Sequence, residues 1–569
     1  MSTPPPPSQP PSGGFGAPQD PPPGGFAPPG GFAPPPPTGP PAPPQQPPAA
    51  PPAPPAYGYP QQPGTQPPFG PPTTPMYAPQ PPAGAGGGNN DKRNQLLIVG
   101  AALLAIVLIV GGGIWYTSGD GGSGDNKNTA DGGPSTGAEG DKPKAGTPGS
   151  EKPPANPKSK TLFKLPSPQP AEVTSVAGSW LTDTTYIKSD VAKVVGYNLV
   201  DGGKKWELPF PGELCGATKH ISDNKTAVLF KASMPTAENK YVQCTEVGVI
   251  DLNTGKLVWS GNAKGATTGD KPASYYEVTI SGQTVAAGGT SGGAAWNLAD
   301  GKSLWTPKVD GEGCYDTGYA GGEALAAIRK CGRSPNQSVY AQVLDPATGA
   351  PTASYKLSPG IDYAGIVSTK PLVVAADVGH TAKNATGVSD LFVVDPKGEL
   401  KARIPLASGN FAGKCAATEV EKCTGMVVGD GKLYLPSYEH QGQAASGRTN
   451  ELLSFDLETG KQTTDRADAG ERYTMVPLRM DGSNIIAYKE PPYDKGGQIV
   501  SIDGKTMKET LLMENPADKA TQRAETAFSP EYSEYRYHNG KLFISRTTVK
   551  KPYSDTGDPE YLFVSFTAS

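Results

Sequence analysis

The sequence contains few of the side chains that build metal centres. Only four histidines occur in 569 residues, at positions 220, 380, 440 and 538, and none of the six cysteines forms a C-x-x-C pair. Transition metals are held in proteins mainly by closely spaced cysteine and histidine side chains. We therefore expect no metal site in this chain.

An excess of positive charge is also missing. The chain has 50 Lys and Arg against 54 Asp and Glu, which gives a net charge of −4 and a pI of about 5.8. Proteins that bind nucleic acids carry a basic surface that neutralises phosphates. The composition therefore argues against nucleic acid as a partner.

The first part of the chain lacks both charge and hydrophobic runs. Residues 1–90 contain one charged residue, Asp20, and 36 of the 65 prolines. A segment of this composition cannot build a core and favours polyproline II conformations. We expect residues 1–91 to form a disordered cytoplasmic tail, which is either a docking site for a proline-recognition partner or only a solvated spacer.

One long apolar run follows this polar start. Leu96–Tyr116 holds 21 uncharged residues, and a helix of that length, at about 1.5 Å per residue, spans about 31 Å and matches a bilayer core. Lys92 and Arg93 precede the run, and Asp120 is the first charge after it. Because positive charge stays on the cytoplasmic side, we expect residues 92–117 to form one transmembrane helix in the lipid bilayer, with the N-terminus cytoplasmic.

A polar linker follows the apolar run. Residues 118–160 consist largely of Gly, Ser, Lys, Asp and Pro, a composition typical of flexible segments. We expect a flexible extracellular stalk that separates the membrane from the domain formed by residues 161–569.

A short turn motif repeats along this last domain. Its best copy, Asp251–Lys256, reads D-L-N-T-G-K and is followed by Trp259. Six further copies begin at residues 198, 297, 345, 395, 456 and 503. The average interval of about 51 residues is typical of propellers and other arrays.

Strand-like runs flank each copy of the motif. Val247–Ile250, Leu391–Val394 and Leu452–Phe455 precede their turns and are rich in β-branched and aromatic residues. In each turn an Asp or Asn starts the bend and a Gly supplies the positive φ. One hairpin cannot bury both its faces, so successive units must stack around an axis. The pattern also predicts that Trp206, Trp259 and Trp305 occupy equivalent positions in their blades, and that each packs between neighbouring blades.

The predicted fold is an all-β propeller of eight blades, with seven blades as the alternative. Seven turns are visible, and two more strand-like runs follow the last one, at 541–545 and 561–566. The run Thr161–Leu165, ahead of the first blade, can supply the missing outer strand of the eighth. Such a closure removes the sheet edges that would otherwise pair with other chains.

The order of these features, a strand followed by D-x-x-T-G-K and then Trp, resembles the repeat of quinoprotein-type propellers. This PQQ-like family includes PQQ-dependent alcohol dehydrogenases and the propeller lipoprotein of the outer-membrane assembly machine. The resemblance covers roughly residues 160–569 and implies a β-propeller. Quinoprotein dehydrogenases also have two adjacent cysteines beside the cofactor, a calcium-binding Glu and Asn, and a catalytic Asp. This chain has no adjacent cysteines, and the other residues cannot be matched. We therefore expect no cofactor and no catalytic residues, with PQQ as the alternative.

The six cysteines all lie in the last domain. An even number of cysteines in an exported domain favours disulfides. Sequence alone allows 15 pairings, and proximity favours one of them: Cys215 with Cys244, Cys314 with Cys331, and Cys415 with Cys423.

Two functions remain open from the sequence. The first is a membrane-anchored, extracytoplasmic propeller that acts as a scaffold for a protein or cell-envelope ligand. The second is a diverged PQQ-dependent oxidoreductase. The missing cofactor ligands favour the scaffold.

The longest interval between turns is the predicted binding region. It spans 61 residues, from 395 to 456, and contains Cys415 and Cys423. Its aromatic and charged residues, of types enriched at interface hot spots, form the candidate binding surface: Phe411, Tyr438, His440 and Arg448. The alternative is a tolerated surface insertion. Replacing residues 410–425 by a short Gly-Ser turn is expected to leave the fold intact and to abolish ligand capture, and capture that survives the replacement would favour the alternative.

Overall fold

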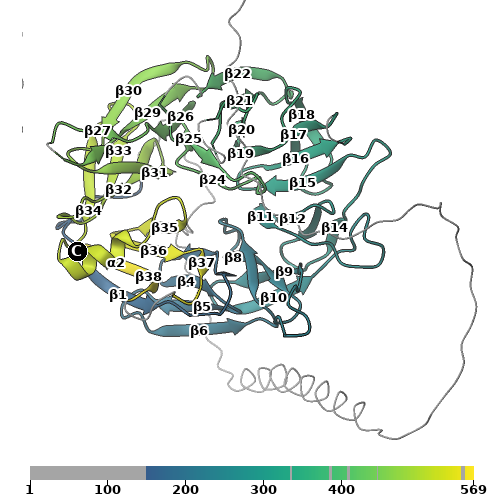
Figure 1. The fold of residues 1–569 in the computed structure, drawn as a ribbon, viewed down its shortest axis with the longest axis horizontal. Helices are drawn as coiled ribbons and strands as arrows, with labels where there is room; N and C mark the ends of the chain where they lie inside the picture. Colours follow the sequence, from purple (N-terminus) through teal and green to yellow (C-terminus); the bar gives the residue numbers. More distant parts are fainter. Residues whose placement is uncertain (1–148, 334–335, 383–386, 407–409, 445, 553–557) are drawn as a thin grey trace, which may run out of the picture. The chain divides into compact units, whose positions relative to one another are not determined.

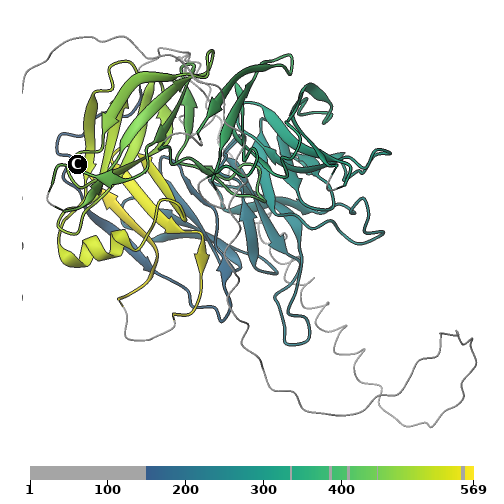
Figure 2. The same ribbon diagram turned by 45° about the horizontal axis from the view of Figure 1, so that its top comes forward.

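Eight four-stranded sheets form a ring around a central axis (Figures 1 and 2). The computed structural model describes residues 149–333, 336–382, 387–406, 410–444, 446–552 and 558–569. The prediction of an eight-bladed propeller is confirmed, and the seven-bladed alternative is wrong. The predicted tail (1–91) and apolar span (96–116) lie outside the described residues. Among the residues described, no helix combines the length and apolar character needed to cross a membrane.

The first four blades each use four consecutive strands. Blade 1 has β3 (Ser179–Leu181), β4 (Thr185–Asp190), β5 (Lys193–Asn198) and β6 (Lys204–Pro209). Blade 2 has β7 (Leu214–Ala217), β8 (Lys225–Lys231), β9 (Cys244–Asp251) and β10 (Lys256–Gly261). Blade 3 has β11 (Glu277–Ser281), β12 (Thr284–Gly288), β13 (Ala294–Asn297) and β14 (Ser303–Trp305). Blade 4 has β15 (Tyr315–Ala320), β16 (Leu325–Cys331), β17 (Ser338–Leu344) and β18 (Pro351–Lys356).

The remaining blades follow the same order, with insertions. Blade 5 has β19 (Ala364–Thr369), β20 (Leu372–Ala376), β21 (Asp390–Val394) and β22 (Leu400–Pro405). Blade 6 has β25 (Val427–Gly429), β26 (Lys432–Pro436), β29 (Glu451–Asp456) and β30 (Gln462–Asp468). Blade 7 has β31 (Thr474–Asp481), β32 (Asn484–Glu490), β33 (Gln498–Asp503) and β34 (Glu509–Glu514). Blade 8 has β35 (Ser533–His538), β36 (Lys541–Arg546), β38 (Tyr561–Thr567) and β1 (Lys160–Pro166).

Blade 8 joins the two ends of the domain. Strand β1 pairs antiparallel with β38, with Thr161 opposite Phe566 and Leu165 opposite Phe563. The predicted closure by the run at 161–165 is therefore confirmed. A short pair, β2 (Thr174–Ser175) and β37 (Thr548–Val549), adds a second connection between these segments.

The strands in the middle of a blade are apolar because another blade packs on each side. Every residue of β20 and β21 is buried, whereas the outer strand β22 is largely exposed and buries only Ala402 and Ile404. The hydrophobic core consists of layers between neighbouring blades. In one such layer Val247 of blade 2 packs with Val285 of blade 3.

The repeated turn is held by its own aspartate. Asp251 Oδ1 accepts hydrogen bonds from the amide and the hydroxyl of Thr254, at 2.8 and 2.9 Å. Gly255 then adopts a φ of 67°, and its amide donates to the Asp251 carbonyl at 2.8 Å. A residue with a Cβ is disfavoured at that φ, which explains the glycine in the motif.

In the seventh turn, the residue with a positive φ differs from the predicted one. The sequence pattern assigned the positive φ to Gly504, but Met507 adopts it, with a φ of 56°. The Met507 amide donates to the Asp503 carbonyl at 2.8 Å, as the Gly255 amide does to Asp251. The motif is therefore D-G-K-T-M-K, and the Asp503–Thr506 hydrogen bonds hold the turn without a glycine.

The predicted tryptophans lie between blades, each against the turn of the next blade. A Cβ added to Gly255 would lie 2.2 Å from the ring of Trp206, and one added to Gly301 would lie 2.7 Å from Trp259. Trp259 Nε1 also donates to the Leu298 carbonyl at 2.9 Å. The turn glycine therefore has a second role, because it makes room for the neighbouring indole. Two further pairs repeat this contact, Trp305 with Gly349 and Phe163 with Gly202.

Substitution of a turn glycine should separate these two roles. Gly431 has a φ of 73° and no atom near a would-be Cβ, whereas Gly255 has a φ of 67° and lies against Trp206. We expect Gly431→Ala to lower the free energy of unfolding by about 1–2 kcal/mol through backbone strain. Gly255→Ala should cost about 1–3 kcal/mol more, because the indole must move. Urea denaturation of both variants measures the difference, and equal losses would contradict the interblade contact.

The last part of the predicted stalk is bound to the propeller. Residues 149–159 precede β1, and the Glu151 side chain in this segment is fully buried. Its carboxylate lies 2.6 Å from Arg479 Nη2 and 3.0 Å from His538 Nδ1. The boundary predicted at residue 160 is therefore too late, because Glu151 is buried against Arg479 and His538 and holds the chain ahead of β1 on the propeller.

Candidate ligand-binding face and propeller axis

The two ends of the propeller differ in the length of their connections. Successive connections in an antiparallel sheet alternate between its two ends. One end, the turn face, carries the repeated D-x-x-T-G turns, and its connections have at most seven residues. The other end, the loop face, carries the links between the second and third strands and those between blades. Its connections reach 15 residues at 262–276, 18 at 515–532 and 21 at 406–426.

The exposed aromatic side chains gather on the loop face. Among the described residues, five tyrosines are strongly exposed, and all lie in loop-face connections: Tyr241, Tyr276, Tyr363, Tyr493 and Tyr532. Three of them directly precede the innermost strand of their blade and so stand beside the axis. These are Tyr276 of blade 3, Tyr363 of blade 5 and Tyr532 of blade 8, with exposures of 47, 53 and 68%.

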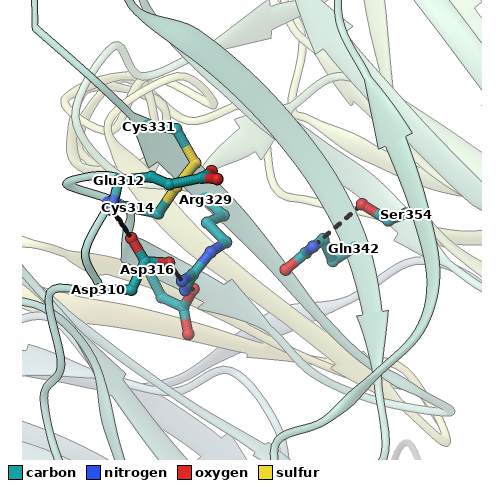
Figure 3. The surroundings of a disulfide bond; sticks show 8 residues. All are labelled: Asp310, Glu312, Cys314, Asp316, Arg329, Cys331, Gln342 and Ser354. Atoms are coloured by element: carbon teal, nitrogen blue, oxygen red, sulfur yellow. Dashed lines mark hydrogen bonds and ion pairs between the residues drawn. A yellow bond between two sulfur atoms is a disulfide. The ribbon is translucent and has the colours of Figure 1, made fainter.

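Disulfides brace the blades that carry these connections. All three predicted pairs are present: Cys215–Cys244, Cys314–Cys331 and Cys415–Cys423. Figure 3 shows Arg329 between Asp310 and Asp316 beside the second bond. Asp310 Oδ1 also accepts from the amide of Cys314 at 2.8 Å. The connection from blade 3 to blade 4 is therefore held by covalent and ionic contacts.

The connection between blades 5 and 6 folds into the centre of the ring. Residues 414–424, which we call the axial hairpin, comprise β23 (Lys414–Cys415), β24 (Cys423–Thr424) and the loop between them. In Figure 1, β24 lies at the centre of the blades. At the base of the axial hairpin, Lys414 Nζ lies 2.6 Å from Glu531 Oε2 of the connection into blade 8.

The tip of the axial hairpin is packed against inner strands. Val420 is 4% exposed and belongs to the hydrophobic cluster of blades 4 and 5. Its carbonyl accepts from the Ile366 amide at 2.7 Å. Glu421 Oε1 lies 2.5 Å from His220 Nε2 of blade 2 and accepts from the Gly321 amide of blade 4 at 3.3 Å. This part of the predicted recognition loop is therefore a plug of the axis, since burial of Val420 draws the hairpin inward.

Two carboxyl groups that meet at the tip of the axial hairpin have pKa values shifted in opposite directions. Burial raises the pKa of Glu277, the first residue of β11, to about 8, and nearby Glu421 adds to the effect. Burial also acts to raise the pKa of Glu421, but the adjacent His220 and Lys219 outweigh it and hold that pKa at about 2. At neutral pH one carboxyl is therefore a neutral acid and the other is an anion.

The four residues of the predicted binding surface lie on adjoining segments but differ in their surroundings, since Phe411 pairs with Ser437 and Arg448 contacts the Glu439 carbonyl. Phe411 packs edge-on against Phe455, with ring centroids 5.0 Å apart, and lines the core of blade 6. His440 and Arg448 lie on the paired strands β27 (His440–Gln441) and β28 (Arg448–Thr449), a hairpin on the loop face. Tyr438 is tied to the preceding connection by its backbone amide. Their role as a binding surface stays a prediction, and Phe411 contributes packing.

The β27–β28 hairpin should respond to pH through His440. Its Nδ1 lies 3.0 Å from the Gln441 carbonyl and its Nε2 lies 2.7 Å from Glu451 Oε1, and these contacts raise its pKa above 6.5. The contribution to stability is therefore complete below pH 6.5 and is lost as the pH rises through the raised pKa. An NMR titration of the imidazole should show the raised pKa, and Glu451→Gln should lower it. The control Glu439→Gln, which removes the partner of Arg448, should not. Equal effects of both variants would contradict this assignment.

Sequence reasoning missed the tyrosines beside the axis and the groups at the tip. The tyrosines beside the axis had a usable signal, because each comes directly before a strand-like run and about half a repeat after the start of a turn motif. No sequence signal marked the groups at the tip of the axial hairpin, since His220 and Glu421 are 201 positions apart.

A family profile described as outer membrane protein assembly factor BamB matches residues 166–310 and 243–509. Together the two matches span residues 166–509, which is more than half of the 569 residues. The chain belongs to the PQQ-like β-propeller family. The resemblance predicted from the turn motif is thereby confirmed for the repeat.

Solved structures with related folds are distant from this PQQ-like propeller. A europium-containing methanol dehydrogenase has 13% identity and a TM-score of 0.39, and the match covers 73% of this chain and 93% of the other. Dihydro-heme d1 dehydrogenase NirN in complex with DHE has 13% identity and a TM-score of 0.30, with coverage of 63% and 80%. Comparison with curated protein sequences found no significant match.

The axis of this PQQ-like propeller does not fit pyrroloquinoline quinone. Between blades 2 and 5 it is filled by the axial hairpin, and the carboxylate of Glu421 would oppose an anionic cofactor there. All six cysteines are used in the three separated disulfides, so no adjacent pair exists. Within the described ranges, no group of three or more His, Cys, Asp or Glu could hold a cation.

Proposed function

We propose that this protein is a scaffold, anchored in the membrane by residues 96–116, that holds a protein or cell-envelope ligand on its loop face outside the cytoplasm. One observation carries the proposal: every strongly exposed tyrosine of the described residues lies on that face. Tyrosine is enriched at interface hot spots, because it gives a large contact area at a low cost in conformational entropy.

Further features support this proposal. The apolar run with Lys92 and Arg93 before it favours a single span with an exported C-terminal domain. Three disulfides within the propeller suit an oxidising compartment. The name of the matching family describes an assembly factor, a protein that acts on other proteins.

The ligand-binding part of the proposal is tested with two matched triple variants of the full-length protein. One replaces Tyr276, Tyr363 and Tyr532 by alanine. The control replaces three exposed residues that lie away from the loop face, Val200, Leu257 and Leu400. Affinity capture from envelope extracts, followed by mass spectrometry and titration of the identified ligand, should show at least a tenfold loss of affinity for the tyrosine variant alone. Unchanged affinity, or equal loss in the control, would reject the loop face.

The membrane part is tested separately. Protease added to intact cells should release a fragment of about 400 residues that contains the propeller, and the tail should stay with the cells. Recovery of the proline-rich tail in the medium would reverse the proposed orientation.

A further inference from the structure

Glu277 occupies a position that suits a neutral carboxyl group. Its Oε2 accepts a hydrogen bond from the Glu421 amide at 3.2 Å. Its Oε1 is buried and has no hydrogen-bond partner among the described residues. The carboxyl lies against the backbone of Gly318, where an added Cβ would come within 1.6 Å of Oε1. Oε1 therefore has no room for a hydrating water molecule in this seat.

The charged groups around this seat cannot neutralise an ionised Glu277. From the axial hairpin, Glu421 and Glu419 both raise its pKa by their negative charge, and burial is the larger cause. The basic groups nearby already contact other carboxylates: His220 and Lys219 contact Glu421, and Lys422 lies 2.8 Å from Glu419. The neighbouring strand β15 presents Gly318 at this point, without a side chain. Loss of the proton would place a second anion under the hairpin.

We propose that the axial hairpin is a proton-linked plug, which is seated in the propeller axis while Glu277 carries its proton and is released when that proton is lost. The plug would thus set whether the propeller axis is closed or open toward the loop face. This device goes beyond the scaffold function and does not depend on the membrane anchor.

The direction of the pH effect follows from linkage. The Glu277 pKa is about 8 in the seated state, against 4.5 for the free group. The seated state therefore binds more protons between these values, and its stability falls as the pH rises through this window. The equilibrium constant for release should rise about tenfold per pH unit across the window, and it should level off above pH 8.

Hydrogen exchange of the full-length protein measures this release. The amide of Ile366 donates to Val420, and that of Glu421 donates to Glu277, so both are protected only while the hairpin is seated. With labelling times scaled to the intrinsic rate at each pH, their protection should fall about tenfold per unit between about pH 5 and 8. Amides of β20 in the same blade serve as the internal reference and should keep constant protection.

Two neutral variants decide the assignment. Glu277→Gln should remove this pH slope, and Glu277→Met should do the same if the glutamine variant does not fold. The control Glu490→Gln replaces a glutamate of blade 7 whose pKa burial also raises, and it should keep the wild-type slope. A flat wild-type profile, or a slope that survives in the Glu277 variants, would overturn the proposal.

Discussion

Replacing Lys188 by alanine should lower the free energy of unfolding by about 3–5 kcal/mol, the usual cost of breaking a buried ion pair. Lys188 lies on β4 of blade 1 and is fully buried, with Nζ 3.0 Å from Glu534 Oε2 on β35 of blade 8. The ammonium also donates to the carbonyl oxygens of Val176 and Gly178. Its removal leaves the Glu534 carboxylate between two blades without this partner, at the point where the ring closes.

Two comparisons show that the loss comes from burial. The double variant Lys188→Met/Glu534→Leu removes both charges and should stay within about 2 kcal/mol of the wild type. Lys264→Ala breaks an ion pair with Asp270 whose side chains are 72 and 96% exposed, and it should change the stability by less than about 1 kcal/mol. Chemical denaturation followed by tryptophan fluorescence measures all three. If Lys188→Ala cost no more stability than Lys264→Ala, the stabilising role of the buried Lys188–Glu534 ion pair would be contradicted.

Replacing the axial hairpin by a short Gly-Ser turn should cost about 3 kcal/mol or more. Burial of Val420 alone is worth about 1.5–3 kcal/mol, and the space left among blades 2 to 5 adds a cavity term. The replacement also leaves His220 without Glu421. The sequence-based expectation that residues 410–425 can be replaced with the fold left intact stays a prediction, and the replacement carries a cost in stability because the segment packs inside the ring.

The matched control for this replacement is an exposed loop-face segment. Residues 266–270 lie between blades 2 and 3 and are mostly exposed. Their replacement by Gly and Ser should change the stability by less than about 0.5 kcal/mol. Equal stabilities of the two variants would show that the axial hairpin contributes no packing.

The propeller could be predicted because its information is local and repeated. In each turn, Asp251 and its equivalents bond to residues three positions ahead, so the motif is visible in a window of six residues. Eight blades followed from seven turns and two strand-like runs after the last of them, and the ring closure followed from a spare strand at each end. The disulfides followed because each pair joins cysteines close in sequence, 29, 17 and 8 positions apart.

The candidate site was less accessible to the same reasoning. The position of Tyr532 directly before a strand can be read from the sequence, but its exposure to solvent, which separates it from the buried tyrosines, cannot. Phe411 and His440 come from one interval, yet Phe411 packs in a blade and His440 lies on a loop-face hairpin. The difference is set by Phe455, with which Phe411 packs.

By itself, the sequence determined the repeat and the chemistry of most turns, and it favoured eight blades and one set of cysteine pairs, since each depends on neighbours along the chain. Only the tertiary structure decided that the interval after blade 5 fills the axis, and that Glu277 and Glu421 meet there, 144 positions apart. It also decided that Met507 takes the place of a glycine. These outcomes depend on what surrounds each residue in space, and the neighbouring charges then decide which of the two carboxyls keeps its proton.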